Sequence, residues 1–126
     1  MTIAAGLRAE LLIMVERGDT AIRQGSGDVP VLGTPRLLAF AEAATVRAVQ
    51  GHLPAGSTSV GTKVTLEHRA ASPVGTHVEV VAELVEVDGR RLVFQVTAND
   101  RTRTVATAVI ERLVVDRERF LGGLGR

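Results

Sequence analysis

Apolar and polar residues follow two different repeats along this 126-residue chain. Between residues 34 and 51 the apolar positions recur every three or four residues, which is the period of a helix that packs one side against a core. From residue 60 onward they recur every second residue, as is typical of strands with one buried face. The pattern therefore predicts one long helix followed by a set of strands.

The helix predicted at Pro35–Gln50 has a signal at each end. Thr34 is suited to be its N-cap, Pro35 suits the first helical position, and Gly51 is a typical stop. Small and aliphatic residues line one side of this helix: Leu37, Leu38, Ala41, Ala44, Thr45 and Ala48. We expect that side to face the core.

Five strands are predicted, one before the helix and four after it. Alternation at Ala5–Val15 favours a strand, with a helix as the competing interpretation. The later strands are Val60–Arg69, Val78–Val87, Leu92–Ala98 and Thr104–Val115, and strict alternation places Val60, Thr62, Val64, Leu66 and His68 on one face. Short antiparallel connections, including a hairpin at Asp88-Gly89, are expected between them. The expected architecture is α+β, an antiparallel sheet that wraps one helix.

The stretch Gly18–Gly33 is rich in Gly, Asp, Ser and Pro and predicts a long loop. Long loops inside compact domains are often lids or binding segments. Neither a repeat nor a low-complexity linker interrupts the chain, so we expect a single domain over residues 1–126.

Composition narrows the function classes. The chain is 45% apolar and 23% charged, which is typical of a globular domain, and aromatic residues make up only 2%. A net charge of +1 argues against a nucleic-acid partner. The lack of cysteine excludes disulfides and thiolate nucleophiles and fits a cytoplasmic protein. We expect no metal or cofactor from the motifs present, and no membrane span, because no apolar run approaches ~20 residues.

Two ionisable residues lie beside apolar positions. Glu42 projects between the two sides of the predicted helix, where a partly desolvated carboxylate could act as a base, or where its head could simply reach water. His68 shares a strand face with Val64 and Leu66. It could transfer a proton near pH 7, or it could be a core-edge histidine bound to a backbone carbonyl.

Thr34 has two interpretations that are compatible with each other. Capping alone explains a threonine before a proline at a helix start. A helix N-terminus also offers free N–H groups and a positive dipole end, which suit a developing oxyanion. A hydroxyl, a carboxylate and an imidazole brought together at a core edge can perform acyl-transfer chemistry.

Three stretches resemble a known family. They are Gly33–Ala48 around Glu42, Gly61–Gly75 around His68, and Val78–Leu92 with its hairpin. From about Val31 to Phe120 the chain is similar to hotdog-fold thioesterases, and most of all to the fluoroacetyl-CoA thioesterase family.

This resemblance implies a fold, a site and partners. The hotdog fold is a curved antiparallel sheet around one central helix. The implied catalytic set is Thr34, Glu42 and His68, and Gly61 is the implied substrate-binding position, where the backbone approaches the thioester. The implied partners are an acyl-CoA substrate and a second copy of the chain, because hotdog domains are at least dimers with sites at the subunit interface.

The chain departs from the family pattern in two places. The family's phenylalanine-containing lid corresponds to Gln24–Asp28, which has no aromatic residue, and Ile110 stands where a histidine commonly precedes an arginine. We therefore expect hydrolysis of a small acyl-CoA thioester rather than fluoroacetyl specificity. The alternatives are a non-catalytic hotdog dimer that binds acyl-CoA or a similar small ligand, and an enzyme that hydrates an enoyl-CoA.

Overall fold

A computed structural model describes residues 3–125 of the chain. In chain order its elements are β1 (Arg8–Met14), a 3-10 turn η1 (Arg17–Asp19), α1 (Ala21–Gln24), α2 (Thr34–Ala48), β2 (Ser57–His68), β3 (His77–Asp88), β4 (Arg91–Asn99), β5 (Thr104–Asp116) and α3 (Arg117–Gly122). All five predicted strands are present, and the segment before the long helix is a strand rather than a helix. Within the described residues, no helix is long and apolar enough to cross a membrane.

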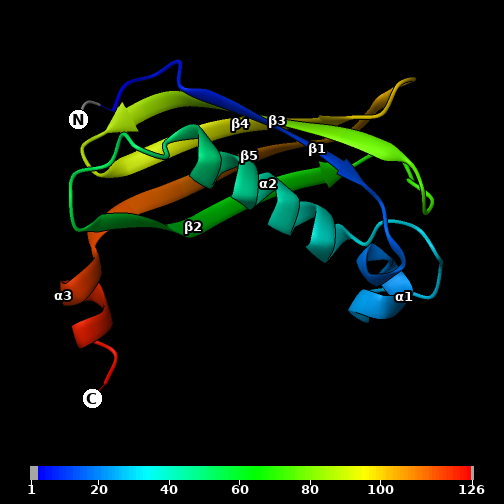
Figure 1. The fold of residues 1–126 in the computed structure, drawn as a ribbon, viewed down its shortest axis with the longest axis horizontal. Helices are drawn as coiled ribbons and strands as arrows, with labels where there is room; N and C mark the ends of the chain where they lie inside the picture. Colours follow the sequence, from blue (N-terminus) through cyan, green and yellow to red (C-terminus); the bar gives the residue numbers. More distant parts are fainter. Residues whose placement is uncertain (1–2, 126) are drawn as a thin grey trace.

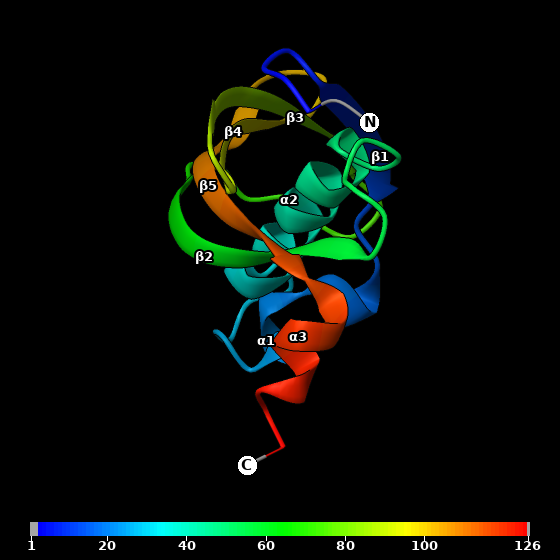
Figure 2. The same ribbon diagram turned by 90° about the vertical axis from the view of Figure 1, so that its left-hand side faces the viewer.

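The five strands form one antiparallel sheet in the order β1-β3-β4-β5-β2, and the sheet curls around α2 (Figures 1 and 2). This arrangement confirms the predicted architecture. One expectation is wrong, because β2 pairs with β5 and not with β3. The chain between β2 and β3 crosses the end of the sheet, where the Leu32 N–H donates to the Ser72 carbonyl over 2.8 Å and Val31 pairs with Pro73. The crossing segment therefore pairs with the chain just before α2.

The core lies between α2 and the inner face of the sheet. The predicted apolar side of the helix is buried through Leu37, Ala41, Ala44, Thr45 and Ala48. Opposite it, the sheet contributes mainly aliphatic side chains, and Phe94 is the largest fully buried side chain. Removing this apolar surface from water is the main force that holds the helix against the sheet.

The start of α2 differs from the prediction. Gly33, with φ −76° and ψ 143°, is the N-cap, and Thr34 is the first helical residue. A Cβ at residue 33 would lie 3.1 Å from the Cα of Ala21 and 3.2 Å from the Oγ of Ser26, so close packing favours glycine there. Thr34 makes no capping bond, and its hydroxyl is available to another partner.

The predicted face is wrong for the first part of β2, because a β-bulge interrupts the strand. The register of β2 against β5 shifts between Gly61 and Lys63, so Gly61 pairs with Arg112, whose side chain is buried. Paired residues of antiparallel strands share a face, and a bulge reverses the alternation beyond it. Gly61, rather than Val60 and Thr62 as predicted, therefore lies on the inner face.

Candidate active site

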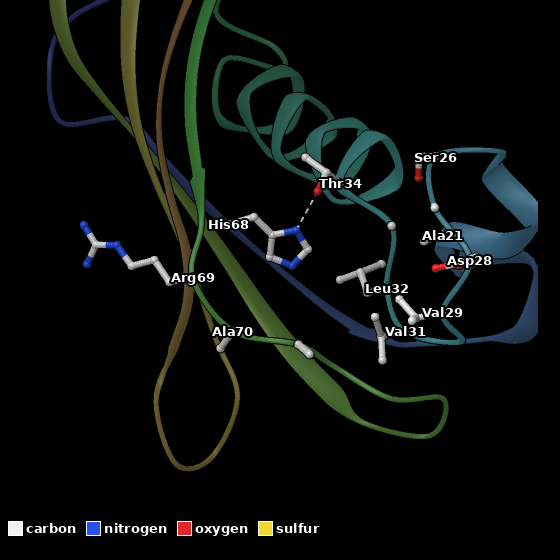
Figure 3. Close-up of a pocket in the computed structure, with 13 residues that line it drawn as sticks. Ala21, Ser26, Asp28, Val29, Val31, Leu32, Thr34, His68, Arg69 and Ala70 are labelled. Atoms are coloured by element: carbon white, nitrogen blue, oxygen red, sulfur yellow. Dashed lines mark hydrogen bonds between the residues drawn. The ribbon is translucent and has the colours of Figure 1, made fainter.

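Thr34 and His68 meet where the start of α2 faces the end of β2. The Thr34 Oγ1 and the His68 Nδ1 are joined by a hydrogen bond of 2.8 Å, whose donor depends on the tautomer of the ring (Figure 3). Both residues belong to regular secondary structure, since Thr34 is the first residue of α2 and His68 is the last residue of β2. The two elements thus hold a hydroxyl and an imidazole in contact.

The surroundings of His68 favour the neutral ring. Burial lowers the pKa of His68, and a polar contact with the Ala70 backbone offsets part of that effect. The Nε2 of His68 is buried and makes no hydrogen bond of normal geometry with the residues that the structure describes. One ring nitrogen is therefore engaged by Thr34, and the other is enclosed without a hydrogen bond of normal geometry.

A hollow of about 350 Å³ opens beside this pair. Thr34 and His68 form one wall, and the opposite wall comes from residues 21–31, which we call the lid (Figure 3). The lid is a loop as predicted, except for the short helix α1. Its neck is closed by the pairing of Thr20 with Leu32 and by a 2.8 Å hydrogen bond from the Ala21 N–H to the Val31 carbonyl.

The base of the lid is tied to α2 through Asp19. This residue is 7% exposed, and its Oδ1 accepts a hydrogen bond of 2.8 Å from the Nε of Arg36. Its Oδ2 accepts from the Glu16 N–H over 2.9 Å. The Arg36 guanidinium also lies 4.3 Å from the centre of the Phe40 ring. The start of the lid and the start of the helix are therefore linked.

A second polar cluster surrounds Glu42. Arg112 donates from Nη1 to the Glu42 Oε2 at 3.4 Å, and it also donates to the side chain and the carbonyl of Ser59, each at 2.9 Å. A Cβ at Gly61 would lie only 2.5 Å from the same Glu42 oxygen. The carboxylate thus lies against the bare backbone of Gly61, with a cation beside it.

Arg112 is a site residue that sequence reasoning missed. Its side chain is 8% exposed; burial lowers the pKa of Arg112, and the Glu42 charge opposes this. An arginine side chain nevertheless stays protonated at neutral pH. The available signal was alternation, because Arg112 continues the inward series of Ala106, Ala108 and Ile110. A charged residue at such a position needs polar partners, which here are Ser59 and the partly exposed Glu42.

The two clusters are separate within one chain. Thr34 and Glu42 lie eight residues apart on α2, which corresponds to about 12 Å along the helix axis. Among the described residues, no hydrogen bond or ion pair joins His68 to Glu42. Within one chain, Thr34 therefore contacts His68 and Glu42 contacts Arg112. The three residues of the predicted catalytic set do not meet at one point.

Comparison with known proteins places the chain in a family. The profile described as fluoroacetyl-CoA-specific thioesterase matches residues 15–118. The chain belongs to this family. The fluoroacetyl-CoA thioesterase of Streptantibioticus cattleyicolor is 39% identical over 90 residues, which are 71% of this chain and 65% of that protein. The alignment thus spans slightly less than two thirds of that relative.

Solved structures confirm the hotdog fold. The fluoroacetyl-CoA thioesterase FlK superposes with a TM-score of 0.91 at 30% identity, over 98% of this chain and 96% of that chain. A mutant of FlK in complex with fluoroacetate and CoA gives a TM-score of 0.86 at 32% identity, over 94% of this chain and 99% of that one. A thioesterase superfamily member from Thermus thermophilus shares the fold at 21% identity, with a TM-score of 0.87, over 95% and 89% of the two chains.

Proposed function

We propose that this chain is a cytoplasmic acyl-CoA thioesterase that hydrolyses small acyl groups as a homodimer. The observation that carries the proposal is the Glu42 carboxylate, held beside Arg112 and against the bare backbone of Gly61. Membership of the fluoroacetyl-CoA-specific thioesterase family supports the same chemistry. A relative that holds fluoroacetate and CoA supports a thioester of CoA as the substrate.

Hydrolysis needs a base or a nucleophile at the thioester carbonyl carbon, and Glu42 is suited to both roles. As a base it takes a proton from water while the water oxygen attacks that carbon. As a nucleophile its own oxygen attacks, and water then cleaves the resulting anhydride. In either route the C–S bond breaks, and the CoA sulfur leaves and is protonated. Arg112 orients the carboxylate through its hydrogen bond to the Glu42 Oε2.

The Thr34–His68 pair is suited to positioning and proton transfer. The neutral imidazole of His68 can pass a proton, and the Thr34 hydroxyl fixes the orientation of its ring. Thr34 also lies at the N-terminus of α2, where backbone N–H groups stabilise negative charge that develops on the carbonyl oxygen.

The separation of the two clusters supports a homodimer. About 12 Å of helix lies between Thr34 and Glu42, so a complete set at one carbonyl would combine residues of two protomers. The edge strand β2 carries Gly61 and His68, and Val46 and Val64 are exposed, at 47% and 37%, on the elements that carry the site. An interface there would cover these side chains.

The test is release of free CoA thiol from a panel of acyl-CoA thioesters. We expect turnover by the parent, and a loss of about 10²–10⁴-fold in kcat for Glu42→Gln and for His68→Asn, because each removes a proton-transfer group. Glu83→Gln, at an exposed position of β3, is the matched control and should retain activity.

Lack of thiol release from every thioester, with the parent folded, would overturn the proposal. Tight binding without hydrolysis, unchanged in Glu42→Gln, would then support the non-catalytic ligand-binding alternative, which the ring-free lid favours. Enoyl-CoA hydration would be recognised by its product, because only hydrolysis releases free CoA.

A further inference from the structure

The lid presents two polar side chains to the hollow beside His68. Ser26 and Asp28 line it from the side opposite Thr34 and His68, and Figure 3 shows both residues on the lid. The remaining lining contributed by the lid and its neck is apolar or glycine. The wall of the hollow that the lid contributes therefore carries a hydroxyl and a carboxylate.

Packing fixes the position of these two residues. A Cβ at Gly27 would lie 3.3 Å from the Cβ of Ala21, so the chain between Ser26 and Asp28 already touches the start of the lid. The Ser26 Oγ approaches the position of a Cβ at Gly33 to 3.2 Å, so this hydroxyl lies beside the start of α2. The lid thus rests on its own base and on the helix.

The charge of Asp28 is not balanced within the hollow. Its carboxylate makes no hydrogen bond or ion pair with any residue in the described part of the chain. Arg69 is the one arginine in the lining, but its side chain points away from the hollow and pairs with Glu67 at 2.7 Å (Figure 3). A molecule in the hollow would therefore meet an acceptor that has no protein partner.

We infer that Asp28 selects acyl groups that carry a hydrogen-bond donor, either a hydroxyl or an ammonium group, at the end remote from the thioester. The inference rests on the proposed function, because it takes the thioester carbonyl to lie at Thr34 and the start of α2. A short chain that begins there and extends toward the lid approaches the wall that carries Asp28. The donor forms a charge-assisted hydrogen bond with the Asp28 carboxylate. A methyl group at the same place forms no such bond, and the carboxylate stays hydrated.

The expected preference is moderate. Asp28 is exposed, so water and salt weaken its field before a substrate enters. We expect kcat/KM to be about tenfold higher for a thioester whose acyl group carries the donor than for one that ends in a methyl group. This factor corresponds to one charge-assisted hydrogen bond of ordinary strength at a partly open site. The preference for an ammonium group should decrease as salt is added, and that for a hydroxyl group should change less.

The experiment compares three thioesters of equal chain length: propionyl-CoA, 3-hydroxypropionyl-CoA and 3-aminopropionyl-CoA. The readout is the ratio of kcat/KM for each substituted thioester to that for propionyl-CoA. In the parent both ratios should be about ten, and in Asp28→Asn the amino ratio should fall at least fivefold, since the charge is lost and the shape is kept. Asp88→Asn, in the distant β3–β4 hairpin, is the matched control and should keep both ratios.

Each outcome is decisive for the inference. Ratios near one in the parent, or equal ratios in the parent and Asp28→Asn, would overturn it while leaving thioester hydrolysis intact. If Asp28→Asn lowers only the hydroxyl ratio, the preferred class is a hydroxyacyl group. If it lowers only the amino ratio, the preferred class is an aminoacyl group. Failure to hydrolyse any of the three would instead count against the proposed function.

Discussion

Gly61 lies so close to the Glu42 carboxylate that a side-chain methyl group at residue 61 would displace it. A Cβ there would lie 2.5 Å from the Glu42 Oε2 and 3.6 Å from the Arg112 Nη1. The backbone of Gly61 has no positive φ, so alanine is compatible with its conformation. The oxygen that would have to move is the end of a flexible side chain, and the cost to the fold should therefore be small.

We expect Gly61→Ala to lower kcat by at least about tenfold with a Tm close to that of the parent, because it displaces the Glu42 carboxylate without straining the strand. Gly122→Ala is the control, since a Cβ at that position meets no atom within 4 Å. Thermal unfolding and thiol release measured on both variants test this. Full activity in Gly61→Ala would show that the observed carboxylate position is not needed for turnover.

The imidazole of His68 should be neutral at pH 7. Burial lowers its pKa, so the folded protein binds this proton more weakly than the unfolded chain does. Stability should therefore rise with pH through the window below the usual value of about 6.5, and change little above it. NMR titration of the three histidine rings, assigned with His68→Asn, gives the pKa directly. A midpoint above about 6.5 for His68 would contradict the expectation.

At the scale of elements, the lid is a loop held at its neck. Thr20 pairs with Leu32 there, and Asp19 joins the base of the lid to Arg36 on α2. Such a closed loop is anchored at both of its ends. The ion pair is half-exposed on the arginine side, at 41%, and nearly buried on the aspartate side, at 10%.

Arg36→Gln should loosen the lid more than it harms the fold. We expect a loss of about 1 kcal/mol in unfolding free energy, the upper end for a partly exposed pair, together with a KM that rises more than kcat falls. Hydrogen exchange at the Ala21 and Gly33 amides, which bond at the neck, should become faster. Arg47→Gln on an exposed face of the same helix is the control, and equal effects in both variants would refute a role for the ion pair.

Periodicity was sufficient to predict α2 and all five strands, because burial of one face leaves a direct trace in the sequence. It could not predict the bulge near Gly61, since an inserted residue looks like ordinary alternation until the partner strand is known. The pairing of β2 with β5, and the contact of Arg112 with Glu42, depend equally on non-local packing. Thr34 was placed correctly at the helix start, but Gly33 took the capping role because the lid packs there.

At the scale of the whole molecule, the proposed homodimer makes a distinct prediction. If the Thr34–His68 pair of one protomer works with Glu42 of the other, then mixing inactive His68→Asn with inactive Glu42→Gln restores one complete site in each mixed dimer. Random exchange of subunits should then recover about a quarter of the parent's activity. Size-exclusion chromatography with light scattering checks the dimer. No recovery after verified exchange would place a complete site within one protomer.

The order of the strands also has a consequence for how the chain folds. Strands β3, β4 and β5 pair with their neighbours in sequence, whereas β2 pairs with β5 across the whole of that meander. Closing so long a loop costs chain entropy, so we expect the meander to form first and β2 to join late. Leu66→Ala in β2 should then speed unfolding more than it slows folding, and Phe94→Leu in β4 should slow folding more. Stopped-flow measurements on both variants would show whether the strand that bears Gly61 and His68 joins after the meander has formed.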